Sequence, residues 1–251
     1  MPDLCKFGSG KEMERKASEN EKVYHQVIEH ITNLAATKEI SFGSKIPSER
    51  ELMATLGFSR NSIREALRTM ENMGIIESRQ GQGNFLVNHI GESLSSVFSM
   101  LLSMEQTNYI EISQLRRFIE IGSYLLAVKS AKKEDLACLS EILDEMDQVK
   151  GEERAKLDKK FHDQIVLISD NHLLELLNEA LSGVFEIFIS EMSKYVTDED
   201  KERLVCLHRN VYDSLKKKDI SEGIERIREH YNIIDRNLQM LAEKYKGVKA
   251  Q

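Results

Sequence analysis

PSERELMATLGFSRNSIREALRTMENMGIIESRQGQGNFLV, residues 47–87, is the stretch that decides the fold of the first third of this chain. Ser48 precedes Glu51 by three positions, the spacing of a capping box, in which two side chains satisfy free backbone N–H groups at a helix start. Pro47 stops any helix from running through from upstream, and Gly57 is the residue type that commonly ends a helix. The sequence therefore predicts a short helix that starts at about Ser48 and ends at Gly57.

A second helix is expected to follow at once, because Ser59 can cap its start and Gly74 can end it. Two short helices joined by a turn that contains glycine are typical of a helix-turn-helix. The next residues favour a short β-hairpin with Gly81 and Gly83 at its tip. Together these elements predict a winged helix.

An amphipathic helix is expected to precede the pair, over residues 20–37. Its apolar residues fall on one face at helical spacing: Val23, Val27, Ile31, Leu34 and Ala35. The residues before it are rich in Gly, Ser and charge, which predicts a flexible tail over 1–19. The winged-helix domain is then expected over 20–87, followed by a linker over 88–92.

The second helix of the pair carries a basic stripe, because Arg60, Arg64 and Arg68 are each four residues apart. Its other face supplies apolar residues for a core: Ile63, Ala66, Leu67 and Met70. Such a helix suits the major groove of DNA, with its N-terminal residues at the base edges. An arginine stripe on an arbitrary helix is usually only a solvated face. Here the capped helix pair and the wing around it favour DNA binding.

Composition limits the class of protein. A length of 251 residues suggests two domains. The net charge of −7 argues at first against nucleic acid, but residues 1–90 hold 12 basic and 12 acidic residues, so the excess of acid lies in the remainder. No transmembrane run or secretory signal is expected. Three scattered cysteines, Cys5, Cys138 and Cys206, have no metal-type spacing and favour a reducing cytoplasm.

From about Gly91 onward the pattern is helical throughout. Helices are expected near 92–105, 109–131, 133–150, 153–169, 171–195, 200–217 and 219–245, with caps at Asn171, Thr197 and Asp219. Short polar joints imply antiparallel neighbours. The predicted fold class is therefore mainly α: a winged helix-turn-helix of three helices and a short β-hairpin, followed by an all-α antiparallel bundle over 93–245.

Four residues of the second half have the character of one metal ligand set. Asp158 and His162 are four apart in LDKKFHDQIV, so a helix places both on one face. His208 and His230 lie on two later helical stretches, each among apolar residues at helical spacing. A bundle could bring the three helix faces together around one ion. A single histidine on a mixed helix is more often a surface or core residue, so the hypothesis depends on all four acting together.

Residues 20–87 resemble the N-terminal domain of GntR-family bacterial transcription regulators, through the strings PSERELMATLGFSRNSIREAL and GQGNFLV. The resemblance implies DNA contacts by the arginine of the S-E-R motif and the two arginines of the recognition helix, with a wing glycine close to the minor groove. These positions are Arg50, Arg60, Arg64 and Gly81; Ser59 and Asn61 at the start of the recognition helix complete the predicted DNA-binding set.

Residues 110–238 resemble the C-terminal FCD domain of the FadR-type branch of that family, through LRRFIEIGSYLLAV, LDKKFHDQIVLISDNHLLELL, LHRNVYDSLKKKD and IREHYNIIDRNL. The resemblance implies that Asp158, His162, His208 and His230 bind one divalent ion per chain, and this ligand set suits Zn, Ni or Mn. It further implies a small carboxylate effector that reaches the metal. Arg116 and Glu120 are expected to line its cavity, with Asn171 as a further candidate; a salt bridge between Arg116 and Glu120 is the alternative.

The resulting hypothesis is a cytoplasmic, one-component transcription regulator and not an enzyme. It is expected to act as a homodimer on a palindromic double-stranded operator, with no membrane contact. Two alternatives stay open. One is a metal-dependent enzyme fused to a DNA-binding head, since three His and a carboxylate could activate water. The other is an effector-independent DNA-binding protein whose bundle serves only for dimerisation.

Overall fold

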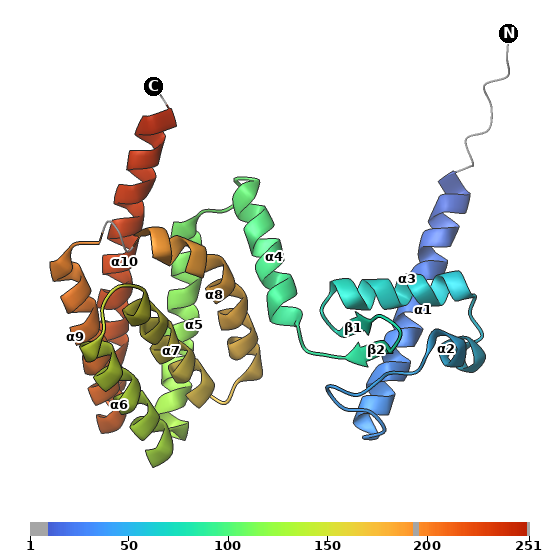
Figure 1. Cartoon of the computed structure of the whole chain (residues 1–251), viewed down its shortest axis with the longest axis horizontal. Helices are drawn as coiled ribbons and strands as arrows, with labels where there is room; N and C mark the ends of the chain where they lie inside the picture. Colours follow the sequence, from blue (N-terminus) through green and yellow to red (C-terminus); the bar gives the residue numbers. More distant parts are fainter. Residues whose placement is uncertain (1–9, 193–195, 250–251) are drawn as a thin grey trace, which may run out of the picture. The chain divides into compact units, whose positions relative to one another are not determined.

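The structure, a computed structural model, describes the backbone of residues 10–192 and 196–249 and the side chains of residues 22–184 and 196–243. The chain divides into two compact units, residues 1–93 and 94–251, each with its own hydrophobic core. Figure 1 shows a smaller unit with a two-stranded hairpin and a larger unit built of helices. Within the described residues, no helix is both long and apolar enough to cross a membrane.

The N-terminal unit is the predicted winged helix. Its elements are α1 (Gly10–Ala36), α2 (Glu49–Leu56), α3 (Arg60–Asn72), β1 (Ile76–Arg79) and β2 (Gly83–Leu86). The predicted capping box opens α2: Ser48 accepts the backbone N–H of Glu51, and the Glu51 carboxylate accepts the backbone N–H of Ser48 at 2.7 Å. Gly57, in the left-handed region at φ 74°, ends α2 as expected, because a glycine has no Cβ to clash there.

The wing is a short antiparallel hairpin. β1 pairs with β2 from Ile76 opposite Leu86 to Arg79 opposite Gly83, so Gly81 lies in the turn with φ 72°. A further bridge joins Lys45 to Phe85, which anchors the hairpin on the segment before α2. The apolar residues of α1, α2 and α3 meet β1 and β2 in one core: Val23, Val27, Ile31, Leu52, Ile63, Ala66, Leu67, Met70, Ile76 and Leu86.

Two helices begin earlier in the chain than expected. α1 begins at Gly10, so residues 10–19 are helical where a flexible tail was predicted; residues 1–9 lie outside the described part. The segment is rich in Lys, Glu, Met and Arg, which are good helix formers and carry the helix upstream. α4 (Ile90–Ser103) likewise begins inside the expected linker, because the carbonyl of His89 accepts the first helical hydrogen bond, from Ser93.

The C-terminal unit is an all-helical bundle. After α4 come α5 (Tyr109–Ser130), α6 (Lys133–Gln148), α7 (Glu152–Ile168), α8 (His172–Met192), α9 (Asp198–Lys217) and α10 (Ile220–Lys249). α5 packs against α7, α8 and α10, and α9 packs against α6 and α10. The inward faces form one core whose fully buried members include Tyr124, Leu139, Leu143, Met146, Phe161 and Ile165. This core fixes α7, α9 and α10 against one another, and these three helices carry the predicted metal ligands.

Several joints of the chain pass through the left-handed backbone region without a glycine. Lys38, Glu105, Asp170 and Lys218 all have φ between 52° and 63°. Lys218 ends α9 in this conformation, and its backbone N–H donates to the carbonyl of Leu215. An L-residue in this region carries a steric cost that glycine avoids.

Candidate metal centre and nucleic-acid interface

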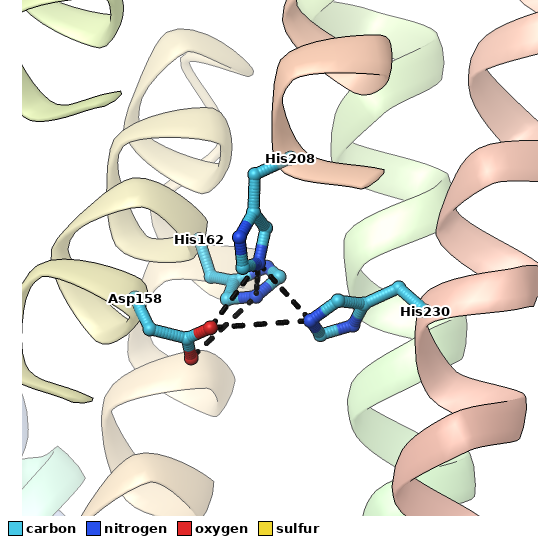
Figure 2. Close-up of side chains that lie close together, drawn as sticks. All are labelled: Asp158, His162, His208 and His230. Carbon is cyan, nitrogen blue, oxygen red and sulfur yellow. Dashed lines mark hydrogen bonds and ion pairs between the residues drawn. The ribbon is translucent and has the colours of Figure 1, made fainter. Parts of the chain in front are cut away.

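The four predicted ligands converge in the interior of the C-terminal unit. α7 carries Asp158 and His162 one turn apart, α9 carries His208 and α10 carries His230. The three imidazoles are buried, with 4% exposure or less, while the Asp158 side chain keeps 27%. Figure 2 shows the four side chains pointing at a common centre from three helices. The predicted set is therefore brought together by the fold.

The distances between the ligand atoms are those of neighbours around one ion. The Nε2 of His208 lies 3.1 Å from that of His162 and 3.0 Å from that of His230. Asp158 Oδ1 lies 3.2 Å from the Nε2 of His208. A metal–nitrogen bond of about 2.1 Å places adjacent ligand atoms about 3.0–3.4 Å apart in octahedral or tetrahedral geometry. Two further separations are longer, 3.8 Å from His162 Nε2 to Asp158 Oδ2 and 4.0 Å from His230 Nε2 to Asp158 Oδ1. The three shorter distances and the donor types fit a divalent ion.

Hydrogen bonds among the four side chains cannot satisfy all of their polar atoms. The Nε2 of an imidazole carries at most one hydrogen, so that of His208 cannot donate to His162, His230 and Asp158 together. A cation at the centre would satisfy all four groups through their lone pairs. The arrangement therefore favours a cation over a hydrogen-bonded histidine cluster.

Behind His162 stands a carboxylate whose role the sequence did not indicate. Glu120 Oε1 lies 2.8 Å from the Nδ1 of His162, although the ring does not point its N–H straight at the oxygen. The other oxygen, Oε2, accepts a hydrogen bond from the hydroxyl of Tyr231 at 2.7 Å. A carboxylate on the far nitrogen of a metal-bound histidine fixes the ring and its tautomer. Glu120 is placed to do this for His162, with Tyr231 holding Glu120.

The electrostatics of the cluster follow from this pairing. Burial raises the pKa of Glu120, but the charge of His162 in close contact and the hydrogen bond from Tyr231 outweigh burial, so the pKa is lowered. Burial raises and the three histidines lower the pKa of Asp158, with a net fall. The pKa of His230 falls well below its usual value, through burial and the neighbouring imidazoles. Both carboxyl groups are therefore anionic at neutral pH, and His230 is neutral. The pKa of His162 is raised instead, because burial lowers it but the charge of Glu120 outweighs burial.

A cavity of about 640 Å³ opens onto the cluster between α6, α7, α9 and α10. Asp158, His208 and His230 form one part of its wall. The remainder mixes apolar side chains with charged ones: Met146, Val196, Leu204, Val205 and Ile234 beside Lys150, Arg154, Asp198, Lys201 and Glu202. Ligand sites commonly combine an apolar wall with a few polar groups in this way. None of the charged residues beyond Asp158 was singled out by the sequence.

The predicted effector residues are not in the wall of this cavity. Arg116 is buried, and its charge acts on Glu120 and Tyr231, but neither Arg116 nor Glu120 lines this cavity. Asn171 does not join them, because its side-chain oxygen accepts the backbone N–H groups of Leu173 and Leu174 at the start of α8. The helix-capping role expected of Asn171 thus occupies its carbonyl oxygen. The effector contacts of Arg116, Glu120 and Asn171 stay predictions.

In the N-terminal unit, the basic stripe of α3 is exposed. The side chains of Arg60 and Arg64 both contact the carboxylate of Glu49, at 3.2 and 3.1 Å, while Arg68 pairs with Glu65 at 3.3 Å. The other predicted DNA-contacting residues are also on the surface: Arg50, Asn61, Ser59 at the helix cap and Gly81 in the wing turn. Glu49 is the residue here that the sequence analysis missed. It follows Ser48 directly and lies on the helix that faces α3.

Comparison with known proteins gives matches over both units. The family model "Bacterial regulatory proteins, gntR family" matches residues 23–86, and the FCD domain model matches residues 111–232. A Bacillus subtilis relative, the uncharacterized HTH-type transcriptional regulator YcbG, is 28% identical over 87% of this chain and 91% of its own length.

Two further comparisons agree with this one. HTH-type transcriptional regulator LutR of Bacillus subtilis is 29% identical over 70% of this chain and 83% of its own. A solved Streptococcus agalactiae GntR protein shares the fold with a TM-score of 0.67 at 21% identity, covering 86% of this chain and 99% of that one. The chain belongs to the GntR family of bacterial regulatory proteins, as a transcription regulator with a helix-turn-helix domain followed by an FCD effector-binding domain.

Proposed function

We propose that this regulator senses a small organic acid through a divalent ion held by Asp158, His162, His208 and His230. The observation that carries the proposal is the convergence of three imidazole nitrogens and one carboxylate on the wall of a cavity. Zn, Ni or Mn suits such a ligand set. When bound, the ion would offer a coordination position to a carboxylate oxygen of the effector. The protein would supply the shaped, partly apolar cavity and would orient His162 through Glu120.

The proposed output is operator binding by the winged helix. Helix α3 would enter the major groove, with Arg60, Asn61 and Arg64 near the base edges and Ser59 at the helix start near a phosphate. Arg50 would add a backbone contact, and the wing turn at Gly81 would approach the minor groove. The support is the exposure of these residues on one capped helix pair and its wing.

The proposed assembly is a homodimer on a palindromic operator. An apolar stripe on α5 supports it: Leu115, Phe118, Leu125 and Leu126 recur at helical spacing and are exposed, Phe118 by 71%. Soluble domains seldom leave such a row in water unless a partner covers it. A second copy of the chain would cover the row and would give the two DNA-binding units needed for two half-sites.

Metal content tests the centre of this proposal. Purified wild-type protein should hold one divalent ion per chain by elemental analysis, and the double variant His208→Ala, His230→Ala should hold none. The matched control is His172→Ala, because His172 is exposed and outside the cluster. An ion retained by the double variant would remove the assignment.

A further inference from the structure

The arginine Arg154 lines the cavity beside the four-ligand cluster. Arg154 lies on α7, four residues before Asp158, so both side chains fall on one face of the helix about 6 Å apart along its axis. The Arg154 side chain is 16% exposed; its guanidinium donates from Nε to the carbonyl of Val149 at 2.9 Å and pairs through Nη1 with Glu202 at 2.9 Å. Within the described residues, the Nη2 of Arg154 has no hydrogen-bond acceptor.

The partner of Arg154 is weakly held. Glu202 is 67% exposed, so its carboxylate is largely in water and can exchange for another anion at small cost. Arg154 therefore has N–H donors available at Nη2, and a ligand carboxylate could also replace Glu202 as the acceptor for Nη1. A planar guanidinium with free donors is the group best suited to bind a carboxylate through two hydrogen bonds.

The charge of the wall adds a second argument. Lys201 pairs with Asp198 at 3.1 Å, and Arg154 pairs with Glu202, so these two pairs cancel. Lys150 also lines the cavity and makes no ion pair within the described residues. With a divalent ion on Asp158 and three neutral histidines, the ion contributes two positive charges, Asp158 removes one and Lys150 adds one. The wall would thus carry two net positive charges, one at the ion and one at Lys150, which favours a ligand with two negative charges.

We infer that the effector is a dicarboxylate, with one carboxylate directed to the four-ligand cluster and the other bound by Arg154. This inference rests on the proposed function, since it needs the ion. It makes Arg154 the residue that distinguishes a dicarboxylate from a monocarboxylate of equal length. The mixed apolar wall between the two ends suits a short carbon chain.

The test compares acids of equal length on the full-length, metal-loaded protein. Succinate, glutarate, adipate and malate are titrated by calorimetry against the monocarboxylates butyrate, valerate and hexanoate and the half-amide succinamate. Ion binding is measured first, so that failure to bind metal counts against the proposed function alone. On protein that holds the ion, at least one dicarboxylate should bind about 10- to 100-fold more tightly than its matched monocarboxylate. Equal affinities across every pair, or no binding of any acid, would overturn the inference.

Two variants attribute the preference to Arg154. Arg154→Gln should retain the ion and reduce the dicarboxylate preference to less than about threefold. Glu202→Gln removes the competing carboxylate from an exposed position, so it should leave the fold intact and strengthen dicarboxylate binding severalfold, with monocarboxylate binding unchanged. If Glu202→Gln leaves the dicarboxylate affinity unchanged and Arg154→Gln keeps the preference, the second carboxylate is not at Arg154.

Discussion

Arg60 and Arg64 share one acceptor, the carboxylate of Glu49, in the DNA-free protein. All three side chains are on the surface, so this contact contributes little to stability but orients both guanidinium groups along α3. On binding DNA the arginines would exchange Glu49 for base edges or phosphates. Arg68, two turns beyond Arg60, pairs instead with its own-helix neighbour Glu65.

The first prediction follows from that difference. Arg60→Ala and Arg64→Ala should each cost roughly 1–3 kcal/mol of specific binding, because a base-edge contact is lost. Arg68→Ala is the matched control and should cost less, evenly across sequences. The measurement is fluorescence anisotropy at one salt concentration, on a site that wild-type protein selects from random DNA. Wild-type affinity in Arg64→Ala would take α3 out of the groove.

A second prediction concerns Glu120, which touches His162 at Nδ1 and accepts from Tyr231. Glu120→Gln should weaken ion binding by about 10- to 100-fold, because the ligand ring loses its anionic partner while the four ligands remain. Competition with a chelator measures this affinity. Tyr231→Phe, which leaves Glu120 facing His162, should have a smaller effect. If Glu120→Gln bound the ion as tightly as wild type, the contact would be purely structural.

Among the helices, the start of α9 shows how one carboxylate joins two elements. Asp200 lies in the first turn of α9 and accepts hydrogen bonds from Arg236 of α10 at 2.6 and 2.7 Å. Asn237 donates to the same carboxylate at 3.3 Å. The hydrogen bond from Arg236 is the main cause that lowers the pKa of Asp200, and burial only partly opposes it.

The third prediction is the pH dependence of this link. A lowered folded-state pKa adds stability above the unfolded pKa of about 4, and this stability is lost as pH falls through the folded value. Asp200→Asn should thus reduce the unfolding free energy by roughly 0.5–1 kcal/mol at pH 7, with a smaller difference below pH 4. Thermal melts across pH give the comparison, with Asp213→Asn, an exposed carboxylate on the same helix, as control. A difference that did not shrink in acid would exclude the carboxylate charge as its source.

The helices and their caps were accessible from sequence because their causes are local. Thr197, Asn171 and Asp219 cap α9, α8 and α10 as expected, each through a side-chain oxygen and a nearby backbone N–H. Of the four metal-ligand candidates, helical spacing pairs Asp158 with His162, and the resemblance to the FCD domain points to His208 and His230. Their convergence is a tertiary result.

The features that could not be predicted from the sequence depend mostly on contacts between distant segments of the chain. Glu120 was expected near the site only through the family resemblance, and its contacts with His162 and Tyr231 across three helices follow no local pattern. Arg154 could have been noticed, since it precedes Asp158 by one turn, but its cavity forms only when α6, α9 and α10 close around it. The start of α1 was missed because charge content was given more weight than helix propensity.

For the molecule as a whole, the exposed row on α5 predicts the oligomeric state. Phe118→Glu should convert a dimer to a monomer, because a charge in the centre of an apolar interface would be buried without a partner. It should also weaken operator binding, since a monomer contacts one half-site, and leave metal content unchanged. Light scattering and the anisotropy assay test both effects. Met240→Glu, at a 63% exposed methionine on α10, is the control. A dimer that survived Phe118→Glu would place the interface on another surface.

The non-glycine joints have a consequence for engineering this protein. Lys38, Glu105, Asp170 and Lys218 each hold a conformation that costs an L-residue free energy. Exchanging Lys218 or Lys38 for glycine should raise the unfolding free energy by roughly 0.5–1 kcal/mol each, the relieved strain exceeding the added freedom of the unfolded chain. Differential scanning calorimetry of the single and double variants would show whether the gains add. A stabilised version made this way would leave helix α3 and the cavity beside the four-ligand cluster unchanged, and so would give heat-tolerant biosensors a starting scaffold.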